Sequence, residues 1–181
     1  MSSNIHNDSL DALRYPIGRV DLTKALDKSA LVQNIQHIAE LPMRLTAIML
    51  PLSAQQIEKQ YRADSWTIRQ LAHHLADSHM NGYIRMKLAF TEDTPVIKPY
   101  AENLWAKTPD NMLSPLVSAE LLVALHARWS FWLGTLSDQD FSRRYFHPEA
   151  KRLYTIAESV TLYAWHGLHH LEHIQLALRS A

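Results

Sequence analysis

Apolar residues recur every three to five positions along most of this chain, which is the spacing of one face of an α-helix. The first such stretch runs from Thr23 to about Leu50, and Pro42 inside it should kink or restart the helix because proline lacks a backbone N–H. Three further stretches follow: Thr67 to Phe90, Ser114 or Ser118 to the region 134–138, and Thr155 to Arg179. The pattern therefore predicts four long helices.

The segments between these helices differ in character. Residues 51–65 should hold a short helical turn at 54–60, followed by Asp64-Ser65 or Thr67 as the cap of the second helix. The long, proline-containing segment 91–115 should carry a short helix at about 102–107 and cover the bundle or form an interface. Residues 1–22 form a polar N-terminal arm that is expected to pack on the bundle, and residues 23–181 form one domain.

Composition agrees with a helical fold. Hydrophobic residues make up 47% of the chain and there are only four glycines among 181 residues, a combination that favours long helices over a turn-rich β architecture. Long connections between four helices are typical of bundles, whose metal sites are built from inward side chains on facing helices. We predict an all-α four-helix bundle.

Charge and cysteine content narrow the classes of function. Lys plus Arg and Asp plus Glu both number 18, so no net charge favours nucleic acid or an anionic membrane surface, and neither is expected as a partner. The absence of cysteine leaves any metal to histidine and carboxylate ligands. The polar N-terminus and the lack of a long apolar run predict a soluble, cytoplasmic protein.

Histidine is concentrated near the C-terminus, within Trp165-His166-Gly167-Leu168-His169-His170-Leu171-Glu172-His173. On a helix these four histidines share one face, and two pairs have the i,i+4 spacing with which neighbouring imidazoles grip one metal ion. The pairs are His166 with His170 and His169 with His173. Spacing alone leaves both pairs open.

A second histidine cluster, His73-His74-Leu75-Ala76-Asp77-Ser78-His79, lies on the second helix and could supply a third ligand. Three histidines that leave an open coordination position are the arrangement of catalytic zinc, since the ion lowers the pKa of a bound water to about 7. The remaining histidines lack neighbours of their own kind along the chain, and we set them aside as ordinary core or surface residues: His6, His37, His126 and His147.

Several other residues near these clusters could take part in a site. Glu172 is a candidate general base, although an exposed glutamate is the commoner role, and its match to the inverted His-x-x-Glu-His motif lacks the downstream carboxylate that motif needs. Asn81 and Arg85 follow His74 on the second helix, and Arg85 could bind an anionic substrate group. Trp165 could line a pocket.

Taken together, the run Ser65-Trp66-Thr67-Ile68-Arg69-Gln70-Leu71-Ala72-His73-His74-Leu75-Ala76-Asp77-Ser78-His79-Met80-Asn81 and the histidines that follow Trp165 resemble the DinB superfamily, and more narrowly its YfiT-like branch. The resemblance extends over nearly the whole chain from Tyr15. It implies a bundle that holds one divalent ion, zinc or nickel, through His74, His169 and His173, with His166 and His170 as neighbours of the site.

The resemblance also implies a class of chemistry. Members of this family are described as metal-dependent hydrolases, and relatives transfer or isomerise small substrates with low-molecular-weight thiols such as bacillithiol. We therefore expect a hydrolase or thiol S-transferase acting on a small molecule, and a homodimer. A second hypothesis from a different class is a non-catalytic, metal-stabilised module for stress-related binding or dimerisation.

Overall fold

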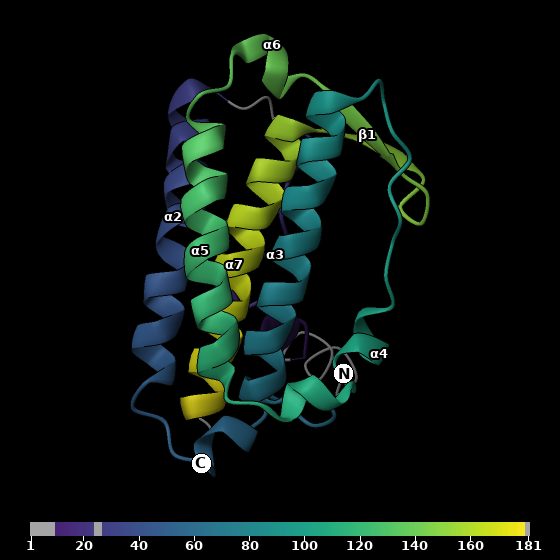
Figure 1. Cartoon of the computed structure of the whole chain (residues 1–181). Coiled ribbons are helices and arrows are strands. Elements are labelled where there is room, and N and C mark those ends of the chain that lie inside the picture. Colours follow the sequence, from purple (N-terminus) through teal and green to yellow (C-terminus); the bar gives the residue numbers. More distant parts are fainter. Residues whose placement is uncertain (1–9, 24–26, 180–181) are drawn as a thin grey trace, which may run out of the picture.

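Four long helices form the body of the molecule (Figure 1). The computed structural model describes residues 10–23 and 27–179. The helices are α2 (Lys28–Met49), α3 (Ile68–Thr91), α5 (Pro115–Leu133) and α7 (Ile156–Arg179). The predicted all-α four-helix bundle is confirmed.

Shorter elements fill the connections. They are η1 (Gln56–Glu58), α4 (Glu102–Trp105), η2 (Pro109–Met112), α6 (Asp138–Phe141), β1 (Arg144–His147) and β2 (Arg152–Thr155). The two strands pair antiparallel, with Arg144 opposite Thr155. This hairpin was not predicted from the sequence, because each strand has only four residues and no clear alternation of apolar and polar positions.

The helix starts are set by capping side chains. Thr67 rather than Asp64-Ser65 is the N-cap of α3. Its hydroxyl accepts from the Gln70 N–H at 3.2 Å, and the Gln70 side chain accepts from the Thr67 N–H at 3.0 Å. Ser114 rather than Ser118 caps α5. Asp27 caps α2, so this helix begins at Lys28 and not at Thr23.

Helix α2 continues through Pro42 and does not restart there, contrary to one of the two expectations. Proline has no N–H to offer the carbonyl four residues earlier, which belongs to Ile38. That carbonyl instead accepts a hydrogen bond from the His126 imidazole on α5, with Nδ1 and O 2.5 Å apart. A contact between helices thus replaces the missing contact within the helix.

The order of the helices along the chain differs from their order around the bundle. The main packing contacts join α2 to α5 and α7, and α3 to the same two helices, so α2 and α3 occupy opposite corners. Figure 1 shows α3 and α7 side by side along their length. This topology brings the two histidine clusters of the sequence together.

The apolar core has two parts, one toward each end of the bundle. Leu71 and Leu75 of α3 belong to the first part and Met86 to the second. Between them on α3 lies His79, which is fully buried. Polar side chains therefore occupy the middle of the core, where water cannot supply their hydrogen bonds.

The described part of the N-terminal arm lies against α7. The Trp165 indole N–H donates to the Gly18 carbonyl at 3.0 Å, and Nε2 of His173 lies 3.2 Å from the Leu13 carbonyl. Residues 1–9 of the predicted arm lie outside the described residues. No helix among the described residues is long and apolar enough to cross a membrane.

Glycine allows α7 to pack closely on α3 and on α2. A Cβ placed on Gly82 of α3 would come within 2.3 Å of the Tyr163 ring on α7, and one on Gly167 of α7 within 2.8 Å of Leu41 on α2. Distances below 3 Å require one group to move, and the Tyr163 ring is fixed between α3 and Trp129. The position of Tyr163 therefore depends on glycine at position 82.

Replacing Gly82 by alanine is expected to destabilise the protein. Overpacking costs about 1–3 kcal/mol, and the higher helix propensity of alanine offsets no more than about 1 kcal/mol of that loss. The matched control is Gly134→Ala at the end of α5, where a Cβ meets nothing closer than 3.5 Å. Denaturant unfolding should show a loss for Gly82→Ala and no loss for Gly134→Ala; equal stabilities would contradict the close approach.

Candidate metal centre

Five histidines of α3 and α7 form two overlapping groups. In the first, His74 of α3 lies with His166 and His170 of α7, and one ring nitrogen of each is within 4.8 Å of the others. The second group contains His169, His170 and His173, all from α7. His170 belongs to both groups, so one ion at either place would draw on it.

Two histidines of the first group already have the spacing of metal ligands. Nε2 of His74 and Nε2 of His166 face each other at 3.2 Å. In a tetrahedral zinc site with Zn–N bonds of 2.0–2.1 Å, any two ligand nitrogens lie about 3.3 Å apart. The edges of the His170 ring meet both partner rings, with centroids 4.9 Å from His74 and 4.5 Å from His166.

The second group is already engaged by other parts of the chain. His173 stacks on Tyr61, with centroids 3.9 Å apart, and its Nε2 contacts carbonyls of the arm. His169 stacks on Trp165 at 4.3 Å. Its Nδ1 is buried without a hydrogen-bond partner.

The set implied by the family resemblance, His74 with His169 and His173, is not assembled as one group among the described residues. Three residues along a helix correspond to a rotation of about 300°, so His169 and His173 lie about 60° around α7 from His166 and His170. On that side of α7 they contact the arm, His173 through the Leu13 carbonyl and His169 through the Tyr15 ring. The other i,i+4 pair, His166 and His170, is the one that meets His74.

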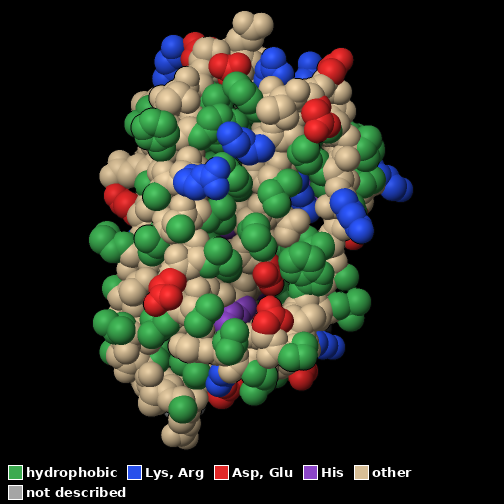
Figure 2. Space-filling model, in the orientation of Figure 1, with side chains coloured by type: hydrophobic (Ala, Val, Ile, Leu, Met, Phe, Trp, Pro, Cys, Tyr) green, Lys and Arg blue, Asp and Glu red, His purple; other side chains and the backbone are tan. Residues whose placement is uncertain are grey.

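The histidines of both groups are held uncharged by their surroundings. Burial lowers the pKa of His74 to about 4, and burial, followed by the neighbouring imidazoles, lowers the pKa of His166 and His170 well below the usual value. Neutral imidazole is the form that binds metal ions. In keeping with this burial, Figure 2 shows histidine at one small place on the face in view.

A line of imidazoles continues from His166 into the core. Nδ1 of His166 lies 3.2 Å from Nε2 of His79, and Nδ1 of His79 lies 3.1 Å from Nε2 of His126. His126 was not predicted to belong to the site, because no other histidine is near it along the chain. The one available signal was Pro42, which leaves the Ile38 carbonyl needing a donor from another helix.

A cavity of about 220 Å³ opens beside His166. Its lining residues come from α3, α4, the hairpin and α7: Ser78, Arg85, Glu102, Tyr145, His147, Tyr154, Leu162, Tyr163 and His166. The structure therefore brings the predicted Arg85 to the cavity. Tyr163, Glu102 and His147 were not predicted, since nothing in their local sequence marks them.

Arg85 is the principal cation of this cavity. Its Nε is buried without a hydrogen-bond partner, and its Nη2 contacts the Lys98 carbonyl at 3.5 Å, the limit of a hydrogen bond. Burial raises the pKa of Glu102, and the charge of Arg85 opposes that rise. Arg85 therefore has a donor without a partner among the residues that line the cavity.

The other predicted site residues have structural contacts. Asn81 donates to the Asp77 carbonyl at 2.8 Å on its own helix. Trp165 contacts the arm and His169 rather than the cavity. Glu172 forms an ion pair with Arg179, one of the last residues of α7, and does not line the cavity beside His166.

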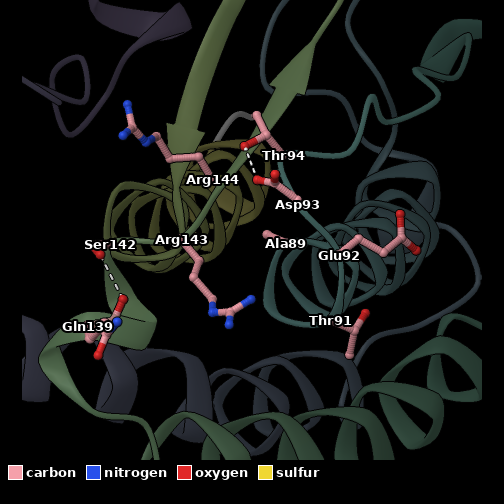
Figure 3. Close-up of a pocket in the computed structure, with 9 residues that line it drawn as sticks. All are labelled: Ala89, Thr91, Glu92, Asp93, Thr94, Gln139, Ser142, Arg143 and Arg144. Atoms are coloured by element: carbon pink, nitrogen blue, oxygen red, sulfur yellow. Dashed lines mark hydrogen bonds between the residues drawn. The ribbon is translucent and has the colours of Figure 1, made fainter.

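A larger pocket of about 480 Å³ lies at the opposite end of α3 (Figure 3). Its lining residue Ala89 is 15 residues from His74, which corresponds to about 22 Å along the helix. Its charged lining residues are Glu92, Asp93, Arg143 and Arg144, and no histidine lines it. This pocket is therefore separate from the metal centre.

Comparison with known proteins identifies the family of the chain. Residues 37–174 match the DinB superfamily. The chain is 46% identical over 165 residues to a Halalkalibacterium halodurans protein named "Putative metal-dependent hydrolase BH0277", covering 91% of this chain and 96% of that protein. It is 42% identical over 163 residues to YfiT of Bacillus subtilis, which carries the same description, covering 90% of this chain and 92% of YfiT.

Solved structures show the same fold. The structure of Bacillus subtilis YfiT, described as a probable metal-dependent hydrolase with an unusual four-helix bundle topology, superposes with a TM-score of 0.89 and covers 93% of this chain and 97% of YfiT. A mycothiol-dependent maleylpyruvate isomerase is similar in fold alone, with a TM-score of 0.65 at 16% identity over 86% of this chain and 63% of the isomerase. By its sequence and its bundle, the chain belongs to the DinB superfamily.

Proposed function

We propose that this protein is a metal-dependent hydrolase of small substrates and that His74, His166 and His170 hold its metal ion. The observation that carries the proposal is the 3.2 Å approach of Nε2 of His74 to Nε2 of His166, on two different helices and beside a cavity. The close relatives are named as metal-dependent hydrolases, which supports the same reaction class.

The donor set suits zinc or nickel. Imidazole nitrogen is a ligand of both ions, and a chain without cysteine offers them no thiolate. A divalent ion held by three histidines supplies a Lewis acid and lowers the pKa of water at its open position. An open position is what separates this proposal from a purely structural, metal-stabilised module.

The residues of the cavity would bind and orient the substrate. Arg85 would bind an anionic substrate group, because its buried Nε lacks a partner. Glu102 also lines the cavity, and burial raises the pKa of its carboxyl, which favours a role in proton transfer. The Tyr163 ring, fixed against Gly82, would limit the size of the substrate.

Cavity volume favours hydrolysis over thiol transfer. Small-molecule sites commonly have volumes of about 300–1,000 Å³, and this cavity has about 220 Å³. A small substrate and a water molecule fit such a space more readily than a substrate together with a low-molecular-weight thiol cofactor. Thiol S-transfer by the same metal centre predicts instead that turnover requires added thiol.

Activity assays with the metal-loaded protein test this choice. Small esters, amides and lactones that carry a carboxylate should be cleaved without any thiol, and chelation of the metal should abolish turnover. Turnover that appears only when a low-molecular-weight thiol is added would contradict hydrolysis as the reaction.

Removing single histidines tests the proposed ligand set. His74→Ala and His170→Ala should each lower zinc affinity by at least about 100-fold, because each leaves two ligands in place of three. His169→Ala is the matched control from the neighbouring group and should lower it by less than about tenfold. Zinc titration against a competing chelator measures all three; a larger loss for His169→Ala than for His170→Ala would instead support the set His74, His169 and His173.

Replacing Arg85 tests the substrate class. Arg85→Met should raise KM for carboxylate-bearing substrates by about tenfold or more, since hydrogen bonds to charged groups contribute about 1.5–3 kcal/mol. Neutral analogues should keep their KM. Arg44→Met, an exposed arginine on α2, is the control and should change neither value. Equal losses on charged and neutral substrates would contradict anion binding by Arg85.

A further inference from the structure

Pro42 has a consequence beyond its own helix. The Ile38 carbonyl has no helical donor, because position 42 lacks an N–H. His126 occupies this place from α5, with its Nδ1 2.5 Å from the carbonyl oxygen. Ile38 and His126 are both about 1% exposed, so water cannot replace either group. A carbonyl oxygen can only accept, and Nδ1 of His126 must therefore carry a proton.

The state of His126 determines the state of the next two imidazoles. A neutral imidazole has one donor and one acceptor nitrogen. With its proton on Nδ1, His126 accepts at Nε2, so the facing Nδ1 of His79 must donate across 3.1 Å. His79 then accepts at Nε2, and the facing Nδ1 of His166 must donate across 3.2 Å. The last lone pair of the line, on Nε2 of His166, faces Nε2 of His74 at 3.2 Å, which donates to it when no metal is bound.

We propose that Pro42, through the Ile38 carbonyl, fixes the tautomers of His126, His79 and His166 and so directs the Nε2 lone pair of His166 toward His74. His126 and His79 are then positioning residues for the metal centre. This inference rests on the proposed function in one respect, which is the metal ion that the lone pair of His166 would bind. The order of protons along the line follows from the contacts themselves.

The far end of the line shows that it holds protons in place and does not conduct them. A proton relay needs a group at each end that can accept and release a proton, and a backbone carbonyl cannot be protonated near neutral pH. The nearly parallel rings of His79 and His126, 18° apart, are enclosed by Trp129 and Tyr163. The line is thus closed at the Ile38 end and open at the metal end.

A fixed tautomer matters for binding because free neutral imidazole in water favours the proton on Nε2. In that form the nitrogen of His166 that faces His74 would carry a proton and could not bind a metal ion. Partners that orient a ligating histidine commonly change metal affinity 10–100-fold. The line of imidazoles would supply this orientation from within the core, where a carboxylate partner would be costly to bury.

Nitrogen NMR of the metal-free protein measures these tautomers directly. Long-range proton–nitrogen spectra at pH 7 should show His126, His79 and His166 in the Nδ1–H form. His73 is the internal control: its Nε2 faces the Leu113 carbonyl at 3.2 Å, so it should show the opposite, Nε2–H form. An Nε2–H form at any of the three overturns the proposal. Since no metal is present, this result is independent of the proposed ligand set.

Two substitutions test the effect on the metal centre. His126→Phe keeps a ring in the core but removes both hydrogen bonds, and should mix the tautomers of His79 and His166 and lower zinc affinity 10–100-fold. Pro42→Ala restores an N–H that shares the Ile38 carbonyl with His126 and weakens the His126 bond; it should raise the melting temperature and yet lower zinc affinity several-fold. His37→Phe on α2 is the control and should leave affinity unchanged.

Pro42→Ala is expected to raise the melting temperature and to lower zinc affinity, and these opposite signs distinguish a positioning role from a structural one. A purely structural proline would change melting temperature and zinc affinity in the same direction, or would leave zinc affinity unchanged. Unchanged zinc affinity in Pro42→Ala overturns the role assigned to Pro42. Unchanged tautomers in His126→Phe overturn the role assigned to His126.

Discussion

Burial of neutral imidazoles between α3 and α7 is the constraint on which this structure depends. Seven histidines are less than 9% exposed: His73, His74, His79, His126, His169, His170 and His173. A buried imidazole costs free energy unless its nitrogens have partners. The contacts of these rings with one another, with backbone carbonyls and with Ser118 satisfy most of them. The hydrogen bonds among these rings therefore offset the cost of a polar core.

The topology of the bundle makes that arrangement possible. Because α2 and α3 occupy opposite corners, α3 is free to pack on α7, and the histidine clusters of both helices meet. Gly82 lets the Tyr163 ring approach α3, which closes one side of the cavity beside His166. Backbone topology, one small residue and one proline thus shape the site as much as the histidines do.

Much of this could be predicted from the sequence. Helical periodicity located all four long helices to within a few residues, and the spacing of the histidines on α7 indicated two chelating pairs. Periodicity could not choose between the pairs, because the choice depends on how α7 is rotated relative to α3. The family resemblance indicated His169 and His173, whereas the structure brings His166 and His170 to His74.

Other features had no local signal at all. The contact of His126 with the Ile38 carbonyl joins residues 88 positions apart, and the cavity collects side chains from four separate elements. The β-hairpin is too short to show alternation. In each case the information lies in tertiary packing, which a single sequence displays only indirectly.

Anomalous diffraction at the metal absorption edge, from crystals of the metal-loaded protein, tests the central claim most directly. The account predicts one peak about 2.0–2.2 Å from Nε2 of His74 and from Nε2 of His166, with His170 as the third ligand. A peak bonded to His169 and His173, with Nε2 of His166 unligated, would contradict it.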